Sequence, residues 1–87
     1  MARVLAMHYG TGRLPPSVVA ANKAELLRKA GEFLKANPDV QFHGSFVSDD
    51  GVGICDWTAP NAAKVVEALK ALGAPYDRVV VVNQVLP

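Results

Sequence analysis

The chain has 87 residues, of which 51% are hydrophobic, and its formal net charge is +1. That length allows one domain with one hydrophobic core, and the scattered charge excludes a nucleic-acid footprint or an acidic membrane surface as partner. No apolar run approaches the roughly 20 residues of a membrane-spanning helix. The single cysteine cannot form an internal disulfide, which is typical of a reducing compartment. We therefore expect a cytoplasmic single domain over residues 1–87.

The first part of the chain predicts a strand followed by a helix. Residues 3–9 form a short apolar run that stops at Gly10-Thr11-Gly12, as expected of a strand that ends in a turn. Pro15-Pro16-Ser17 suits a helix start, and apolar side chains then recur at helical spacing. Asn37-Pro38 ends this helix, because the residue before a proline avoids the helical conformation.

Residues 41–57 are predicted to form one β-hairpin. The turn Asp49-Asp50-Gly51 suits a three-residue loop, in which a type I turn is followed by a left-handed residue. This loop sets a register that pairs Val47 with Gly53, Ser45 with Cys55 and His43 with Trp57. His43 and Cys55 then lie diagonally on one face, with backbones about 7–8 Å apart. The opposite face is expected to be apolar and to carry Phe42, Phe46, Val52 and Ile54.

The last part predicts a second helix and a final strand. Ala59-Pro60-Asn61 suits a helix start, and Gly73 suits the position that follows a helix. The apolar stripe of this helix consists of Ala62, Val65, Val66, Leu69 and Leu72. Residues 77–86 are expected to form the last strand.

The resulting element order, β-α-β-β-α-β, is that of the ferredoxin-like split motif. Right-handed crossovers then predict an α+β sandwich, in which two helices cover one face of a four-stranded antiparallel sheet. Residues 79–82 are all valine, and a continuous apolar run indicates cover on both faces. We therefore expect a homodimer that packs sheet to sheet, as in dimeric α/β barrels. The alternative is a monomer with an unusually apolar sheet.

Several short motifs also resemble a family of small, uncharacterised ferredoxin-like proteins, some of which are described as nickel-binding. The motifs are the strand end at His8, His43-Gly44-Ser45-Phe46-Val47-Ser48-Asp49-Asp50-Gly51, Ile54-Cys55-Asp56-Trp57-Thr58-Ala59-Pro60 and Ala74-Pro75-Tyr76-Asp77-Arg78-Val79. The resemblance spans nearly the whole chain, and it implies the same fold and nickel as a candidate metal. Some relatives carry further histidines on the helices, in regions where this chain has Asn22 and Lys70. If those histidines hold metal, this chain lacks part of that site.

His8, His43 and Cys55 form the candidate metal site. Imidazole nitrogen and thiolate sulfur suit nickel, copper, zinc and iron, so the residue types indicate a divalent transition metal without selecting the ion. If Leu5 and Met7 face the helices, His8 lies on the other face of the sheet, and we expect His43 and Cys55 to join it there. Alternatively, His43 is an exposed edge-strand residue and Cys55 is a small buried hydrophobe.

Two other classes of function stay open. One is a cofactor-free enzyme of the dimeric α/β-barrel type, similar to a monooxygenase or isomerase, with its site in a cleft between sheet and helices. The residues expected in that cleft, Phe42, Phe46 and Ile54, look like plain core. The other class is a small-ligand regulatory module of the same topology. No nucleophile–base pair is evident in the sequence, so a binding protein is favoured over an enzyme.

Overall fold

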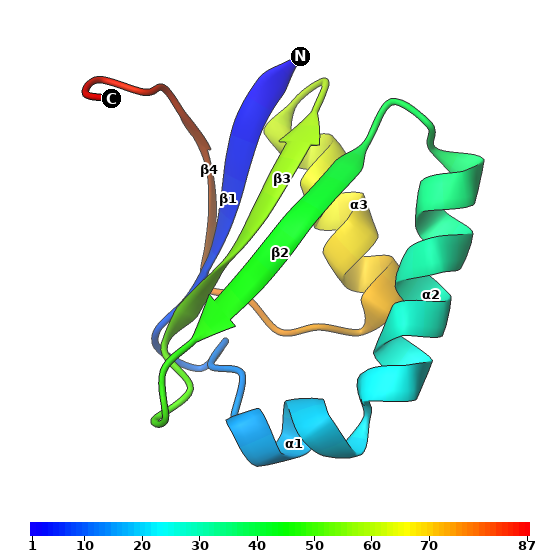
Figure 1. The fold of residues 1–87 in the computed structure, drawn as a ribbon, viewed down its shortest axis with the longest axis vertical. Helices are drawn as coiled ribbons and strands as arrows, with labels where there is room; N and C mark the ends of the chain where they lie inside the picture. The colour runs from blue at the N-terminus through cyan, green and yellow to red at the C-terminus, as the bar shows by residue number, and fades with distance from the viewer.

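The computed structural model describes residues 1–87 and has the predicted ferredoxin-like topology. The strands form one antiparallel sheet in the order β2-β3-β1-β4, and Figure 1 shows α2 and α3 on the same side of it. None of the helices has the length and hydropathy of a membrane-spanning segment. The elements are β1 Ala2–His8, α1 Pro16–Ala21, α2 Lys23–Ala36, β2 Gln41–Val47, β3 Gly53–Ala59, α3 Ala62–Leu72 and β4 Arg78–Val82.

The first predicted helix is in fact two helices, α1 and α2, that meet at Asn22. The backbone of Asn22 departs from the helical conformation, with φ −111° and ψ 12°. Its side-chain amide donates to the carbonyl of Val18 at 2.8 Å, a local bond of the kind by which asparagine competes with regular helix. Figure 1 shows α1 lying across the lower end of α2 rather than continuing it. The chain therefore turns a corner where a single helix was expected.

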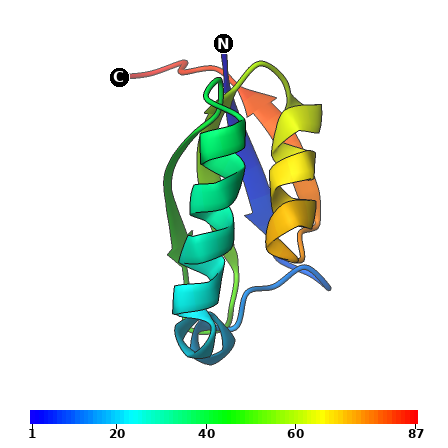
Figure 2. The same cartoon turned by 90° about the vertical axis from the view of Figure 1, so that its right-hand side faces the viewer.

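The hydrophobic core lies between the sheet and α3. Neither α1 nor α2 contributes a fully buried residue, and α2 packs mainly against α3 rather than against the strands. Figure 2 shows the two long helices side by side over the sheet. The space between α2 and the edge strand β2 is therefore only partly filled. The buried apolar residues are Val4, Ala6, Val40, Cys55, Trp57, Ala59, Val65, Ala68 and Leu69.

The faces of the sheet are the reverse of those predicted. On β1, His8 and Ala6 are buried beneath the helices, whereas Leu5 and Met7 are only partly buried on the face that carries no helix. We call this helix-free side of the sheet the open face. The larger side chains were expected to form the core, but the small ones let α3 approach the central strands closely. The same reversal puts Cys55 under the helices, where the prediction had placed Phe46 and Ile54 instead.

The hairpin has the predicted three-residue loop. The N–H of Ser48 donates to the carbonyl of Val52 at 2.8 Å, and the N–H of Gly51 donates back to the Ser48 carbonyl at 2.9 Å. Gly51 has a φ of 85°, in the left-handed region. The predicted pairing of Ser45 with Cys55 is also confirmed.

A β-bulge at His43 alters the other end of the hairpin. The register shifts between Phe42 and Gly44, so Trp57 pairs with Phe42 and the predicted pairing with His43 was wrong. Gly44 has a φ of 141°, a conformation that other residues rarely adopt. A bulge inserts one extra residue into a strand and changes the direction of its side chain. His43 is thereby separated from the face that Cys55 occupies.

We expect Gly51→Val to lower the free energy of unfolding by about 1–2 kcal/mol, because a side chain is strained in the left-handed region. A Cβ atom at this position would also lie 3.3 Å from the backbone of Leu14. Chemical denaturation measures the effect. Gly31→Ala is a suitable control, since nothing lies within 4 Å of an added Cβ there. This helical substitution should stabilise the protein by about 0.5–1 kcal/mol. A Gly51→Val protein as stable as the wild type would contradict the assigned turn.

Candidate functional site

The structure brings two of the three predicted site residues, His8 and Cys55, into contact beneath the helices. They lie diagonally on the neighbouring strands β1 and β3, where Cys55 pairs with Ala6 and His8 pairs with Gly53. The Nε2 atom of His8 is 3.1 Å from the Sγ atom of Cys55. His8 is fully buried, and Cys55 is 6% exposed. The pair is therefore shielded from bulk water.

The carbonyl of Gly12 fixes the tautomer of His8. The Nδ1 atom lies 2.9 Å from this oxygen, and because a carbonyl can only accept, Nδ1 must carry a proton. In the neutral ring, Nε2 then has a free lone pair directed at Cys55, and the thiol S–H is the donor of that contact. His8 is thus placed to take the thiol proton.

Asp77 holds the loop that carries the Gly12 carbonyl. Its carboxylate accepts hydrogen bonds from the backbone N–H groups of Gly10 at 2.8 Å, Tyr9 at 2.6 Å and Gly12 at 3.1 Å. These bonds, those from Gly10 and Tyr9 above all, lower the pKa of Asp77. Gly12 has no room for a side chain, since a Cβ atom would lie 2.3 Å from the carbonyl carbon of Tyr76. The position of this loop therefore determines the orientation of the imidazole.

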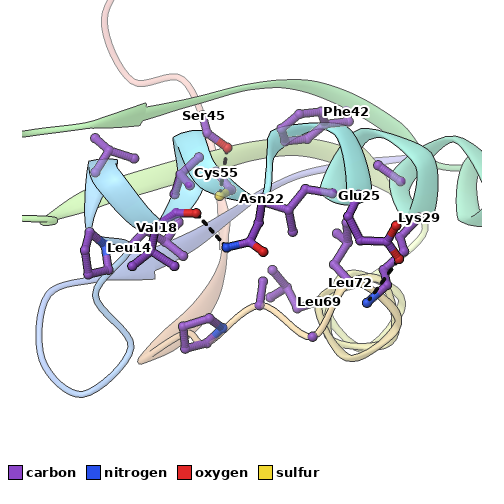
Figure 3. Close-up of a pocket in the computed structure, with 18 of the residues that line it drawn as sticks. Leu14, Val18, Asn22, Glu25, Lys29, Phe42, Ser45, Cys55, Leu69 and Leu72 are labelled. Atoms are coloured by element: carbon purple, nitrogen blue, oxygen red, sulfur yellow. Dashed lines mark hydrogen bonds and ion pairs between the residues drawn. The ribbon is translucent and has the colours of Figure 1, made fainter.

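Ser45 is the third group at the sulfur, and the sequence analysis did not assign it a role. Its hydroxyl donates to Cys55 Sγ at 3.0 Å (Figure 3). Burial raises the pKa of the Cys55 thiol, and the bond from Ser45 offsets this only in part. Burial therefore favours the thiol of Cys55 over its thiolate. A metal ion or a base must remove that proton before the sulfur can act as ligand or nucleophile.

His43 is not part of this cluster. Its side chain is exposed, and Nε2 lies 2.6 Å from the hydroxyl of Thr58, which alternates with the buried residues of β3 and so belongs to the open face. No group of three or more His, Cys, Asp or Glu side chains converges within the chain. The predicted convergence of His8, His43 and Cys55 on the open face was therefore wrong, and the structure leaves a pair on the opposite face.

A cavity of about 380 Å³ lies beside Cys55, between the sheet and the helices. Its walls come from α1, α2, α3, β2 and β3, and 12 of the 20 lining residues are hydrophobic. Figure 3 shows Cys55 and Ser45 on one wall and Glu25 with Lys29 at a distance from them. Plain hydrophobic core was expected in this region. The turn at Asn22 and the incomplete packing of α2 on the sheet leave this space open.

Trp57 belongs to the same wall, two residues from Cys55 on β3. It is 2% exposed, and its indole Nε1 is the one buried side-chain polar atom that has no hydrogen-bond partner. A buried donor without an acceptor is costly, by about 1–3 kcal/mol. The cavity thus borders a side chain whose polar group is unsatisfied.

Comparisons with known proteins agree with the fold and indicate a family. A family model described as "Nickel responsive protein SCO4226-like" matches residues 6–82. The crystal structure of SCO4226 from Streptomyces coelicolor A3(2) superposes on the chain with a TM-score of 0.68 and 16% sequence identity, covering 98% of this chain and 100% of that one. At that identity the structural likeness supports the fold alone. A comparison with curated protein sequences finds no match.

Proposed function

Because the chain belongs to the nickel-responsive, SCO4226-like family, we propose that it binds nickel or a similar divalent transition metal through His8 and Cys55. The observation that carries this proposal is the contact of 3.1 Å between Nε2 and Sγ. One atom offers a lone pair, and the other becomes a thiolate once its proton is lost. Imidazole and thiolate are ligands that suit nickel, copper and zinc.

His8 and Cys55 would hold one ion between them only after the thiol proton has left. The Nε2 lone pair points at Sγ, 3.1 Å away, so the imidazole would have to turn from its bond to the Gly12 carbonyl for both donor atoms to face the same ion. The two donors alone do not select one of these metals.

The cavity offers a route to this pair and room for further ligands. Cys55 lines the cavity, whereas His8 lies behind it. Two protein donors leave the remaining coordination positions to water, to the Ser45 hydroxyl or to a small molecule in the cavity. The absence of a third strong donor supports modest affinity, as expected of a protein that responds to a metal rather than storing it permanently.

Calorimetric titration of chelator-treated protein with Ni²⁺ tests the proposal. Cys55→Ser and His8→Gln should each weaken nickel binding by about 10- to 100-fold or more. Loss of a residue that only supports a metal ligand already has an effect of that size. His43→Ala is the matched control and should bind like the wild type, because that side chain lies on the open face. Binding should release a proton and strengthen between pH 6 and pH 8, because the protonated thiol must ionise. Equal affinity of wild type and Cys55→Ser would exclude the site.

We also propose that the chain forms a homodimer through the open face. Phe46 is 67% exposed there, and adjacent apolar side chains are only partly covered. An extended exposed apolar patch is typical of an interaction surface. Arg3 and Asp56 form a two-bonded ion pair on this face, at 2.6 Å for each bond, and so neutralise each other. Arg78, which pairs with Met7, is a further charged residue of this face. The apolar residues of the face are Leu5, Met7, Phe46, Ile54, Val80 and Val82.

A further inference from the structure

We propose that, in the metal-free protein, Cys55 is a nucleophile that adds to small apolar electrophiles in the cavity, with His8 as its base. The electrophile is an α,β-unsaturated ketone or aldehyde. This activity uses the same pair as the proposed metal site but needs no metal, so either proposal can hold without the other.

The first support is the arrangement around the sulfur. A nucleophile, a base within hydrogen-bond reach and a third group that orients the base together form the signature of nucleophilic catalysis. Here the contacts are 3.1 Å from Cys55 Sγ to His8 Nε2 and 2.9 Å from His8 Nδ1 to the Gly12 carbonyl. The Ser45 hydroxyl, 3.0 Å from the sulfur, stabilises the negative charge that develops when the thiol proton leaves.

The second support is the cavity, which defines the class of electrophile. Its volume of about 380 Å³ lies within the usual range for small-molecule pockets, about 300–1,000 Å³. Most of the lining residues are apolar. Of the charged ones, Glu25 and Lys29 pair at 3.9 Å, whereas the guanidinium of Arg13 donates to the Tyr9 carbonyl at 3.0 Å and has no acidic partner. The predominance of apolar walls favours an uncharged molecule.

The unsatisfied indole of Trp57 adds a preference for a hydrogen-bond acceptor. Cys55 and Trp57 point to the same face of β3 because they are two residues apart in one strand. An electrophile whose carbonyl reaches Nε1 would supply the acceptor that this buried N–H lacks. A carbonyl conjugated to a carbon–carbon double bond carries both the acceptor and the reactive carbon.

The addition balances without an oxidant or a reductant. The sulfur forms a bond to the β-carbon, and the π electrons of the double bond move onto the carbonyl to give an enolate. The thiol proton passes to His8 Nε2, a water molecule in the cavity protonates the enolate at its α-carbon, and the proton that His8 then releases neutralises the remaining hydroxide. The product is a saturated thioether on Cys55, and the base is regenerated.

The rate of adduct formation by chelator-treated protein with phenyl vinyl ketone, followed by intact mass at pH 7, tests the proposal. We expect saturation with increasing ketone and competition by propiophenone, the saturated analogue. The para-carboxylate of the same vinyl ketone should react at least about tenfold more slowly, since the cavity is apolar. Adduct formation that is no faster in folded than in urea-unfolded protein, or that propiophenone does not slow, would overturn the proposal.

Two variants separate the role of the base from that of the cavity. His8→Gln should lower the rate by about 100-fold or more, as is typical for loss of a general base. Because His8 is fully buried, its substitution can also disturb the fold, so a second variant is made at an exposed position. Val18 lines the cavity and is 54% exposed, and Val18→Trp should slow the reaction by obstructing the cavity. Val81→Trp, at a position that is 51% exposed and lines no cavity, should not. Equal rates for the two tryptophan variants would count against the cavity.

Discussion

Replacing Trp57 with alanine should lower the free energy of unfolding by about 3–5 kcal/mol, the usual cost of truncating a buried large aromatic residue. Trp57 is 2% exposed at the centre of β3, where it belongs to the core beneath the helices. Its ring lies 4.6 Å from that of Phe42, in a tilted arrangement of 50°. Alanine removes that contact and leaves a void next to the existing cavity. The loss of buried area and the void both destabilise the fold.

Trp57→Phe is the informative control for this experiment. The indole N–H makes no hydrogen bond, so phenylalanine removes volume but no satisfied polar contact. We expect it to cost less than half as much as alanine. Urea denaturation followed by circular dichroism measures both variants, because the chain has no other tryptophan to report by fluorescence. Equal costs for the two variants would mean that the aromatic packing is not what holds this part of the core.

The elements that could be predicted from the sequence are those with strong local signals. Asn61 caps α3 by accepting from the N–H of Lys64 at 3.0 Å, and Gly73 ends that helix with a φ of 68°. Turn and cap residues act on their own neighbours, so their effect does not depend on the rest of the fold. This is why the hairpin loop at Gly51 and the bounds of α3 were predicted correctly, whereas the division of the first helix at Asn22 was not.

Which face of the sheet lies under the helices depends on packing between distant elements, and such packing leaves no local signal in the sequence. Alternate residues of β1 are apolar on both sides, so the pattern fixed the alternation but not which set faces the helices. Size suggested Leu5 and Met7 for the core, yet close approach of α3 favoured Ala6. Arg78–Val82 is also shorter than the strand predicted over residues 77–86, since the apolar residues beyond it, such as Val85 at 88% exposure, have nothing to pack against.

The candidate site could be predicted only where local signals determine the positions of its residues. The hairpin register correctly brought Ser45 opposite Cys55, but the bulge at His43 moved that histidine away. Gly44 was the available signal, because a glycine inside a strand often marks a bulge. The contact between His8 and Cys55 spans 47 positions in sequence, and no spacing motif reveals it. The contact of His8 with the Gly12 carbonyl, which sets the tautomer, has no sequence signal either.

The open face should tolerate a charge poorly if it is a dimer interface. Ile54 lies on β3, one of the two central strands, paired with Met7 and Phe46, and its side chain points away from the helices. We expect Ile54→Asp to raise the dimer dissociation constant by at least about 100-fold, equivalent to about 2.7 kcal/mol. The reason is that a carboxylate placed among apolar side chains loses its hydration and gains no partner. Sedimentation velocity over a range of micromolar concentrations measures the change.

Leu27→Asp is the matched control for the dimer. Leu27 is 60% exposed on α2, on the opposite side of the sheet from the open face, so a charge there should leave the dissociation constant unchanged. Circular dichroism shows whether Ile54→Asp stays folded as a monomer, which separates loss of assembly from loss of structure. A wild-type protein that sediments as a monomer at these concentrations would contradict the dimer, as would equal dissociation constants for the two aspartate variants. Because His8 and Cys55 lie beneath the helices, neither substitution should alter nickel binding. Their effects on assembly and on metal affinity should therefore be separable in the same samples.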